Sequence, residues 1–133
     1  MLEAMQRWSA VFCLVAALAA PQGGGRLRPP EKIPCVREKL TSFTGKVQSY
    51  SRDEAHLALT VRTDEDTTEK LTLRYEKKDD PARWFLLWSE AFQPSDWAAI
   101  EAARGRLRAG MRATAWVCEG GGNPIIDWQP PRD

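Results

Sequence analysis

HLALTVRT, residues 56–63, alternates apolar and polar side chains without a break. On an extended chain the two kinds of side chain fall on opposite sides, with Leu57, Leu59 and Val61 on one and Ala58, Thr60 and Arg62 on the other. A period of two is typical of a β-strand that buries one face and exposes the other. The stretch therefore predicts a strand at the centre of a small sheet.

A second alternating stretch follows directly, at residues 69–75 (EKLTLRY). Its Leu71, Leu73 and Tyr75 are expected to point inward. The charged residues 64–66 (DED) between the two stretches are typical of a turn, so the pair predicts a β-hairpin with a loop of several residues.

Three further strands and one helix complete the predicted elements. Shorter strand patterns lie at 44–50 (TGKVQSY), 111–118 (MRATAWVC) and 124–128 (PIIDW). Residues 83–91 (RWFLLWSEA) are apolar without a clean period, which leaves a short strand and a buried helical turn both open. A helix is predicted from residues 94–96 (PSD), where a side-chain oxygen can cap free amides. Its apolar face is formed by Trp97, Ile100, Ala103 and Leu107.

The order of three strands, a helix and two strands resembles the OB-fold, a five-stranded Greek-key barrel with a helix after its third strand. The resemblance covers residues 43–128 and rests on order and spacing, including the entry to the fourth strand at 107–112 (LRAGMR). The expected fold is therefore mainly β, an OB-like five-stranded Greek-key barrel with one helix. Residues 35–129 form one domain of ordinary small size, and 130–133 are a tail.

The first 19 residues are interpreted as a signal peptide. Trp8 to Ala20 carries no charge over 13 residues, too short a run to cross a membrane, and Ala17-Leu18-Ala19 supplies small residues for cleavage after Ala19. A start at Met5 gives a more basic leader, and an uncleaved anchor or a core helix is the alternative. Residues 20–34, rich in glycine and proline, are expected to be a flexible linker. The mature chain is then exported, periplasmic or secreted, without a membrane span.

The cysteines agree with export. The chain has three, and Cys13 leaves with the leader. Because two cysteines in an exported protein usually pair, a disulfide between Cys35 and Cys118 is expected, with two free thiols as the alternative. The first and fourth strands of an OB barrel are antiparallel neighbours, and this arrangement would bring the two cysteines together.

No catalytic motif, metal site or cofactor site stands out. His56 is the only histidine, which excludes a multi-histidine metal site, and no serine has the glycine pattern of a nucleophile elbow. The acidic residues 64–69 lack the central glycine of a calcium loop, and the glycines 120–122 lack the Lys-Ser/Thr pair of a phosphate loop. We therefore expect a protein that is not an enzyme and that needs no cofactor.

The resemblance to the OB-fold implies a binding site on the outer face of the second and third strands, with the first and last interstrand loops. Aromatic and arginine side chains there can stack on bases or sugars. Trp116 alternates with Arg112 and Thr114, which predicts that it lies outside the barrel, with Trp128 near it. The alternative is that these rings cover the barrel bottom and the disulfide. The candidate ligand-binding residues are Arg52, Arg62, Arg74, Trp116, Glu119 and Asn123.

The leading interpretation is an exported, non-catalytic binding module. Its partner would be an envelope protein, a glycan or another small polar molecule. The alternative is a structural or assembly protein of the cell envelope. A third hypothesis is the binding of single-stranded nucleic acid, against which export and a net charge of only +1 both argue.

Overall fold

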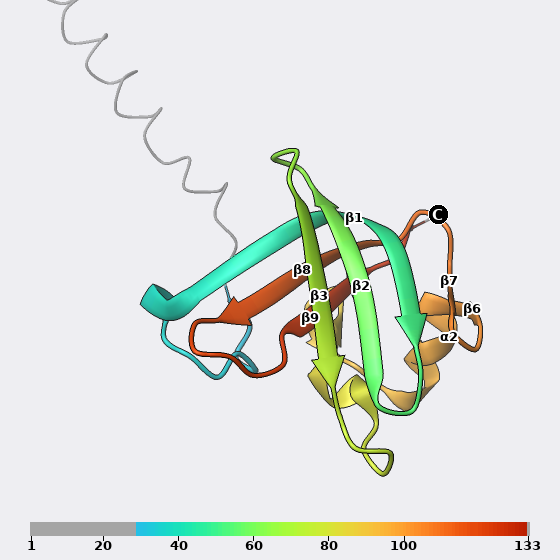
Figure 1. Cartoon of the computed structure of the whole chain (residues 1–133). Helices are drawn as coiled ribbons and strands as arrows, with labels where there is room; N and C mark the ends of the chain where they lie inside the picture. The colour runs from blue at the N-terminus through green and yellow to red at the C-terminus, as the bar shows by residue number, and fades with distance from the viewer. Residues whose placement is uncertain (1–28, 133) are drawn as a thin grey trace, which may run out of the picture.

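The computed structural model describes residues 29–132, so the predicted leader and residues 20–28 of the predicted linker lie outside the described part. These described residues form nine strands, most of which are labelled in Figure 1: β1 (Leu40–Arg52), β2 (His56–Thr63), β3 (Thr68–Arg74), β4 (Phe85–Leu87), β5 (Glu90–Ala91), β6 (Glu101–Ala103), β7 (Arg106–Leu107), β8 (Arg112–Cys118) and β9 (Ile125–Gln129). The helical elements are η2 (Arg37–Lys39), η3 (Pro81–Trp84), η4 (Pro94–Asp96) and α2 (Trp97–Ile100). Within residues 29–132, no helix has the length and apolar character needed to cross a membrane.

The main sheet has seven strands in the order β3-β2-β1-β8-β9-β4-β5, and a small hairpin pairs β6 with β7. Neighbouring strands run antiparallel except β4 and β9, which are parallel. The predicted mainly β fold is confirmed, but the five-stranded barrel is not, because the main sheet has seven strands and its pairing ends at β3 on one side and at β5 on the other. The chain leaves β3 through residues 75–84, and the separate strand β4 takes the place beside β9.

Strand β1 belongs to both halves of the sheet. Residues 40–46 pair with β8 and residues 45–52 pair with β2, so Gly45 and Lys46 have a partner on each side. At Gly45 a Cβ atom would lie 2.0 Å from the carbonyl oxygen of Arg62, so only glycine fits between the strands. Figure 1 shows β1 bending at this region, which brings β2 and β3 in front of β8 and β9.

The core lies between these two halves and confirms the alternation in the sequence. Leu57, Leu59 and Val61 are buried, as are Leu71 and Leu73 on β3. The other half contributes apolar side chains from β4, from β8 and the residue before it, and from β9: Phe85, Met111, Ala113, Ala115, Ile126 and Trp128. Phe85 packs edge-to-face against Trp97 and Trp128, with ring centroids 5.4 and 5.3 Å apart. The half with β2 and β3 thus contributes aliphatic side chains, whereas the other half contributes the rings of Phe85 and Trp128 together with aliphatic side chains.

The predicted helix is much shorter than its pattern. It ends at Ile100, because Glu101 adopts an extended backbone (φ −112, ψ 127) and begins the β6–β7 hairpin. Gly105, with φ +78, lies in the turn of that hairpin. Trp97, Ile100 and Leu107 nevertheless pack against the core, whereas Ala103 is exposed. The apolar spacing therefore identified core residues correctly and the element wrongly.

The opposite side of β8 carries a second, smaller apolar cluster of Leu86, Trp116 and Ile125, against which Ile33 packs. Lys32 at the end of the predicted linker donates a hydrogen bond from Nζ to the carbonyl oxygen of Phe85 (3.2 Å). Residues 29–34 therefore contact the sheet.

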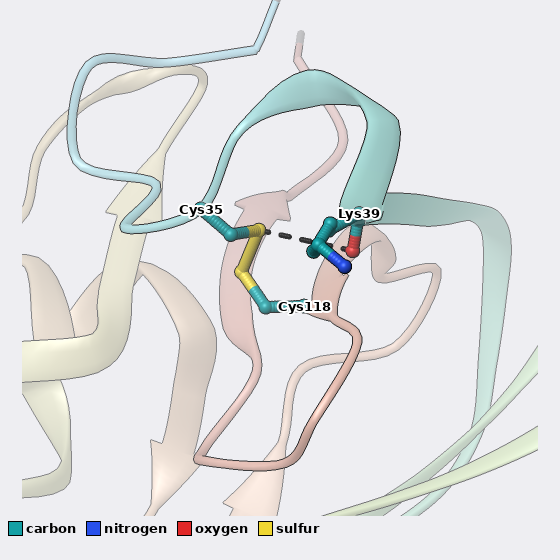
Figure 2. Close-up of a disulfide and its surroundings, with 3 residues drawn as sticks. All are labelled: Cys35, Lys39 and Cys118. Atoms are coloured by element: carbon teal, nitrogen blue, oxygen red, sulfur yellow. Dashed lines mark hydrogen bonds between the residues drawn. A yellow bond between two sulfur atoms is a disulfide. The ribbon is translucent and has the colours of Figure 1, made fainter.

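The predicted disulfide between Cys35 and Cys118 is present, with the two Cα atoms 5.9 Å apart (Figure 2). Leu40 at the start of β1 pairs with Cys118 at the end of β8, which confirms that the two strands are antiparallel neighbours. Cys35 reaches Cys118 because the turn η2 folds back, and its Sγ lies 3.9 Å from the carbonyl oxygen of Lys39. The bridge links residues 83 positions apart.

Replacing both cysteines by serine, Cys35→Ser with Cys118→Ser, should lower the free energy of unfolding by up to about 4–5 kcal/mol. The reason is that the bridge restricts a loop of more than 80 residues in the unfolded chain. Urea unfolding of the oxidised protein and of the double variant measures the difference. The oxidised protein treated with a reductant serves as the control and should match the variant. Equal midpoints for all three would contradict a stabilising bridge.

Candidate functional site

The outward side of three adjacent strands carries several cations and no carboxylate. We call this surface the β1–β3 face and define it by its side chains: Lys46, Ser49, Ser51, His56, Ala58, Thr60, Arg62, Thr68, Lys70, Thr72 and Arg74. Glu69, the acidic residue within these strands, alternates to the other side with Leu71 and Leu73. The acidic residues nearest to the face lie in the turns at its two ends. The surface is therefore electropositive although the chain is nearly neutral.

Two cations of the face form one row with Arg112 of the neighbouring strand β8. Lys46 pairs with Arg62 of β2 and with Arg112 of β8. Adjacent strands lie about 4.8 Å apart, so like charges at this spacing repel unless they have counter-ions. Arg112 donates to Asp64 over 2.6 Å and Arg62 lies 3.6 Å from Asp66, both in the β2–β3 turn. Two of the three charges are thus partly balanced, which leaves Lys46 in the middle of the row.

Next to this row the face is hollowed. Ser49 pairs with Thr60, which pairs with Lys70, and Ser51, Ala58 and Thr72 form the following row. Apart from Lys70, these side chains are small. Together with Lys70 they line a shallow hollow of about 220 Å³. Hydroxyl groups on the floor and ammonium or guanidinium groups around it are donors suited to an anionic group.

A bulge in β1 creates this floor. The register with β2 shifts between Val47 and Ser49, so Gln48 is an extra residue on β1. After the bulge, Ser49 and Ser51 point outward, whereas Tyr50 and Arg52 turn to the inner side and are partly buried. If the alternation ran unbroken from Lys46 through Gln48, Tyr50 and Arg52 would lie on the β1–β3 face.

The inward side chains meet Glu101, which is buried. Arg52 donates to Glu101 through Nε (2.8 Å) and Nη2 (2.6 Å), and its guanidinium lies 4.5 Å from the Trp97 ring centroid. The Tyr50 hydroxyl also donates to Glu101, and the Gly105 amide donates over 3.2 Å. The bidentate arginine–carboxylate pair, with the Tyr50 hydroxyl and the Gly105 amide as further donors, has its polar groups well satisfied. It ties β1 to the β6–β7 hairpin directly beneath the face.

These contacts shift the pKa values of Glu101, Tyr50 and Arg52. Burial alone would raise the pKa of Glu101, but hydrogen bonds from Arg52, Tyr50 and the Gly105 amide outweigh it and hold the pKa below 4.5. Burial and the hydrogen bond to Glu101 raise the pKa of Tyr50, which stays neutral and keeps donating. The hydrogen bond to Glu101 likewise raises the pKa of Arg52. Near neutral pH, Glu101 is thus ionised and paired.

A larger hollow of about 460 Å³ lies beside the Arg52 end of β1. Most of its charged groups already have partners: Asp53 accepts from the amides of Ala55 and His56, Asp80 accepts from the amide of Ala82, and Glu54 lies 3.6 Å from Lys77. The two amides hold the pKa of the Asp53 carboxyl below its usual value. Since cations and carboxylates alternate here, this hollow has no net preference for an ion of either sign. We take the β1–β3 face as the stronger candidate.

The structure separates the predicted ligand-binding residues. Arg62 and Arg74 are both exposed on the β1–β3 face, at opposite ends, six positions or roughly 20 Å apart along the strands. The side chain of Asn123 bonds the backbone of Arg74, accepting from its amide (2.9 Å) and donating to its carbonyl (2.8 Å). Glu119 is exposed in the β8–β9 loop and its amide donates to the carbonyl of Lys39. Arg74 and Asn123 are therefore the pair that the fold brings together.

The two remaining candidates are covered. Arg52 is engaged by Glu101, with its side chain 12% exposed. Trp116 lies on the side of β8 opposite the core, as the alternation indicates, but it is 6% exposed and packs in the second apolar cluster. Trp128 is not near it, since Trp128 lies in the core against Tyr50 and Phe85. Neither indole offers a free ring for stacking.

Sequence reasoning missed Lys46 and Lys70. Each occupies an outward position of an alternating strand, so the alternation marked both as exposed. Their importance comes from which strands are neighbours and in which register, and a single strand pattern does not contain that information.

No metal centre is formed in the described part of the chain. Among residues 29–132, no three His, Cys, Asp or Glu side chains are grouped so that they could hold an ion. Comparisons with protein-family models, with curated proteins and with solved structures give no significant match. The charge and shape of the surface are therefore the features that indicate a function.

Replacing Glu101 by glutamine should lower the free energy of unfolding by about 3 kcal/mol at neutral pH, because Arg52 loses its partner. The wild-type carboxylate has a depressed pKa, so its contribution is present above the ordinary pKa of 4.5 and is lost as pH falls through the lower folded value. The gap between Glu101→Gln and wild type should therefore close in acid. Urea unfolding as a function of pH measures it.

Glu119→Gln, which neutralises an exposed carboxylate, is the matched control and should leave the unfolding curve nearly unchanged. A gap between Glu101→Gln and wild type that stays constant with pH would contradict a stabilising charge on Glu101.

Proposed function

We propose that the protein is an exported, non-catalytic binding module that holds an anionic partner on the β1–β3 face. The observation that carries the proposal is the surface itself. Lys46, Arg62, Lys70 and Arg74 surround a floor of hydroxyl groups, and no carboxylate belongs to the face. In a chain of net charge +1, such a concentration of one sign selects an anionic partner over a neutral one.

The arrangement suits binding better than catalysis. The face is open and the hollow is shallow, so bound groups stay in contact with water and electrostatic effects on a transition state would be weak. His56, the chain's one histidine, lies at the edge of the face, 3.6 Å from Asp53 in the β1–β2 turn and away from the hollow. The residues of the floor are serine, threonine and alanine, and none has a neighbouring base to activate it.

Export is supported by the disulfide and by the sequence of the first 19 residues. A bridge between residues 83 positions apart persists in an oxidising compartment and is rare in a reducing one. The two lines of support are independent, because one is a pattern in the leader and the other is a contact in the folded domain.

Reversing two charges, Lys46→Glu with Lys70→Glu, should weaken binding of a fluorescent hexaglutamate peptide by at least tenfold. Each substitution replaces an attraction by a repulsion, at the Arg62 end of the face for Lys46 and beside the hollow for Lys70. Fluorescence anisotropy at two ionic strengths measures the affinity, which should also fall with added salt. Unfolding in urea should change little, since both side chains are exposed.

The matched control is Lys77→Glu with Lys78→Glu, which makes the same change in net charge on the loop after β3. It should keep most of the affinity. Equal weakening in both double variants would show attraction to overall charge and would contradict a site on the β1–β3 face. The proposal also fails if the wild-type protein does not bind the peptide at low salt.

The full chain, produced in a bacterial host, should be recovered from the periplasm or medium with Ala20 as its first residue. Intact mass and N-terminal sequencing measure this outcome. Introducing a charge into the apolar run, Leu14→Lys, should leave the chain uncleaved in the cytoplasm, because an apolar stretch is what the export machinery binds. A full-length cytoplasmic product from the wild-type gene would contradict export.

A further inference from the structure

Strand β3 is an edge strand of the main sheet, and the residues whose backbone groups face its unpaired edge can be identified. The amide of Thr63 donates to the carbonyl of Thr67 (2.8 Å), and the amide of Tyr75 donates to the carbonyl of Ala55 (3.0 Å). In an antiparallel pair the bonded residues alternate, so between these two points the odd-numbered residues of β3 bond to β2. The amides and carbonyls of Thr68, Lys70, Thr72 and Arg74 therefore point away from the sheet.

One of these four residues already has a strand-like partner. The Asn123 side chain accepts from the Arg74 amide and donates to the Arg74 carbonyl, the two bonds that a residue of a neighbouring strand would make. The edge is thus able to accept backbone-type partners, and Asn123 occupies its last position. Three residues, Thr68, Lys70 and Thr72, are left exposed and, within the described chain, unpaired along this edge.

The free edge and the cationic surface belong to the same residues. Side-chain direction and hydrogen-bond direction both alternate with a period of two, so the residues with edge-facing amides also place their side chains on the β1–β3 face. A segment added beside β3 would therefore lie next to Lys70 and Arg74. Backbone bonds would hold it, and the cations would select its charge.

A second copy of this chain does not suit the edge. Pairing β3 with another β3 would bring Lys70 and Arg74 of one copy close to the same residues of the other, and like charges across a strand pair are destabilising. An extended segment with glutamate or aspartate at alternate positions would instead place its carboxylates beside these cations. Charge complementarity thus favours an acidic partner.

We propose that β3 binds an extended, acidic segment of a partner polypeptide as an eighth strand of the sheet, ending where Asn123 covers Arg74. This inference rests on the proposed function and adds the chemical class of the partner and its mode of binding. Flat anionic ligands such as sulfated glycans would use the cations of the face without using the edge.

The test uses the mature chain and two eight-residue peptides of equal charge. One alternates glutamate with threonine, and the other has the same sequence with every backbone amide N-methylated. The N-methylated peptide has no amide that can donate to β3 in either strand direction, so it reports charge alone. Thr72→Pro removes an edge-facing amide without removing a bond to β2, and Thr72→Ala is its matched control. Anisotropy measures the affinity of each pair.

We expect the wild-type protein and Thr72→Ala to bind the unmodified threonine peptide at least tenfold more tightly than the N-methylated peptide. Thr72→Pro should lose that preference and keep the weaker binding. Equal affinity for both peptides in the wild type would overturn strand addition and leave the proposed anionic site standing. If Lys46→Glu with Lys70→Glu has no effect on either peptide, both proposals fail.

A second measurement does not depend on the proline variant. Amide hydrogen exchange in the wild-type protein should slow at least tenfold at Lys70 and Thr72 when the threonine peptide is added, because those amides become bonded. Their exchange should be unaffected by a sulfated polysaccharide of similar charge. Unchanged exchange in the presence of saturating threonine peptide would overturn the proposal.

Discussion

The position of Gly45, where one strand serves two halves of a sheet, is the constraint on which the rest of the structure depends. A side chain there would collide with the backbone of β2, so the close crossing requires glycine. Because β1 continues through the crossing, its first half sets the register of β8 and its second half sets that of β2. The first register places Leu40 opposite Cys118 and so allows the disulfide; the second places Lys46 beside Arg62.

Three residues further along, the bulge at Gln48 decides which side chains reach water. Relative to an unbroken alternation counted from Lys46, the bulge reverses the sides of the residues that follow it. Ser49 and Ser51 therefore face outward on the floor, and Tyr50 and Arg52 face inward to Glu101. The buried pair and the exposed hollow both depend on this bulge. A buried arginine would be costly alone, and the carboxylate from the β6–β7 hairpin offsets that cost. That hairpin exists because the helix stops at Ile100, which leaves Glu101 extended and facing Arg52.

The sequence predicted the parts of the fold that depend on local alternation. Residues 56–63 and 69–75 gave strands with the correct buried side, and the cysteines gave the correct bridge. It failed where a long-range contact overrides a local pattern. The spacing of Trp97, Ile100 and Leu107 suited a helix, yet the bond between Glu101 and Arg52 and the left-handed Gly105 favour a hairpin in which Trp97, Ile100 and Leu107 still reach the core. Likewise Arg52, which the sequence suggested as a ligand-binding residue, is paired with Glu101, 49 positions away.

The edge of β3 shows why charge and backbone geometry have to be considered together. A free edge in a small exported domain invites pairing between copies, and proteins commonly oppose this with lysine on the edge and with charges pointing inward. Lys70 and Glu69 are such residues, and Asn123 closes the last position. The protection is selective, however, because it rests on the sign of the charge. Cations that repel a second β3 attract a carboxylate-bearing strand by the same electrostatic interaction, so an edge guarded against its own copies remains open to an acidic partner.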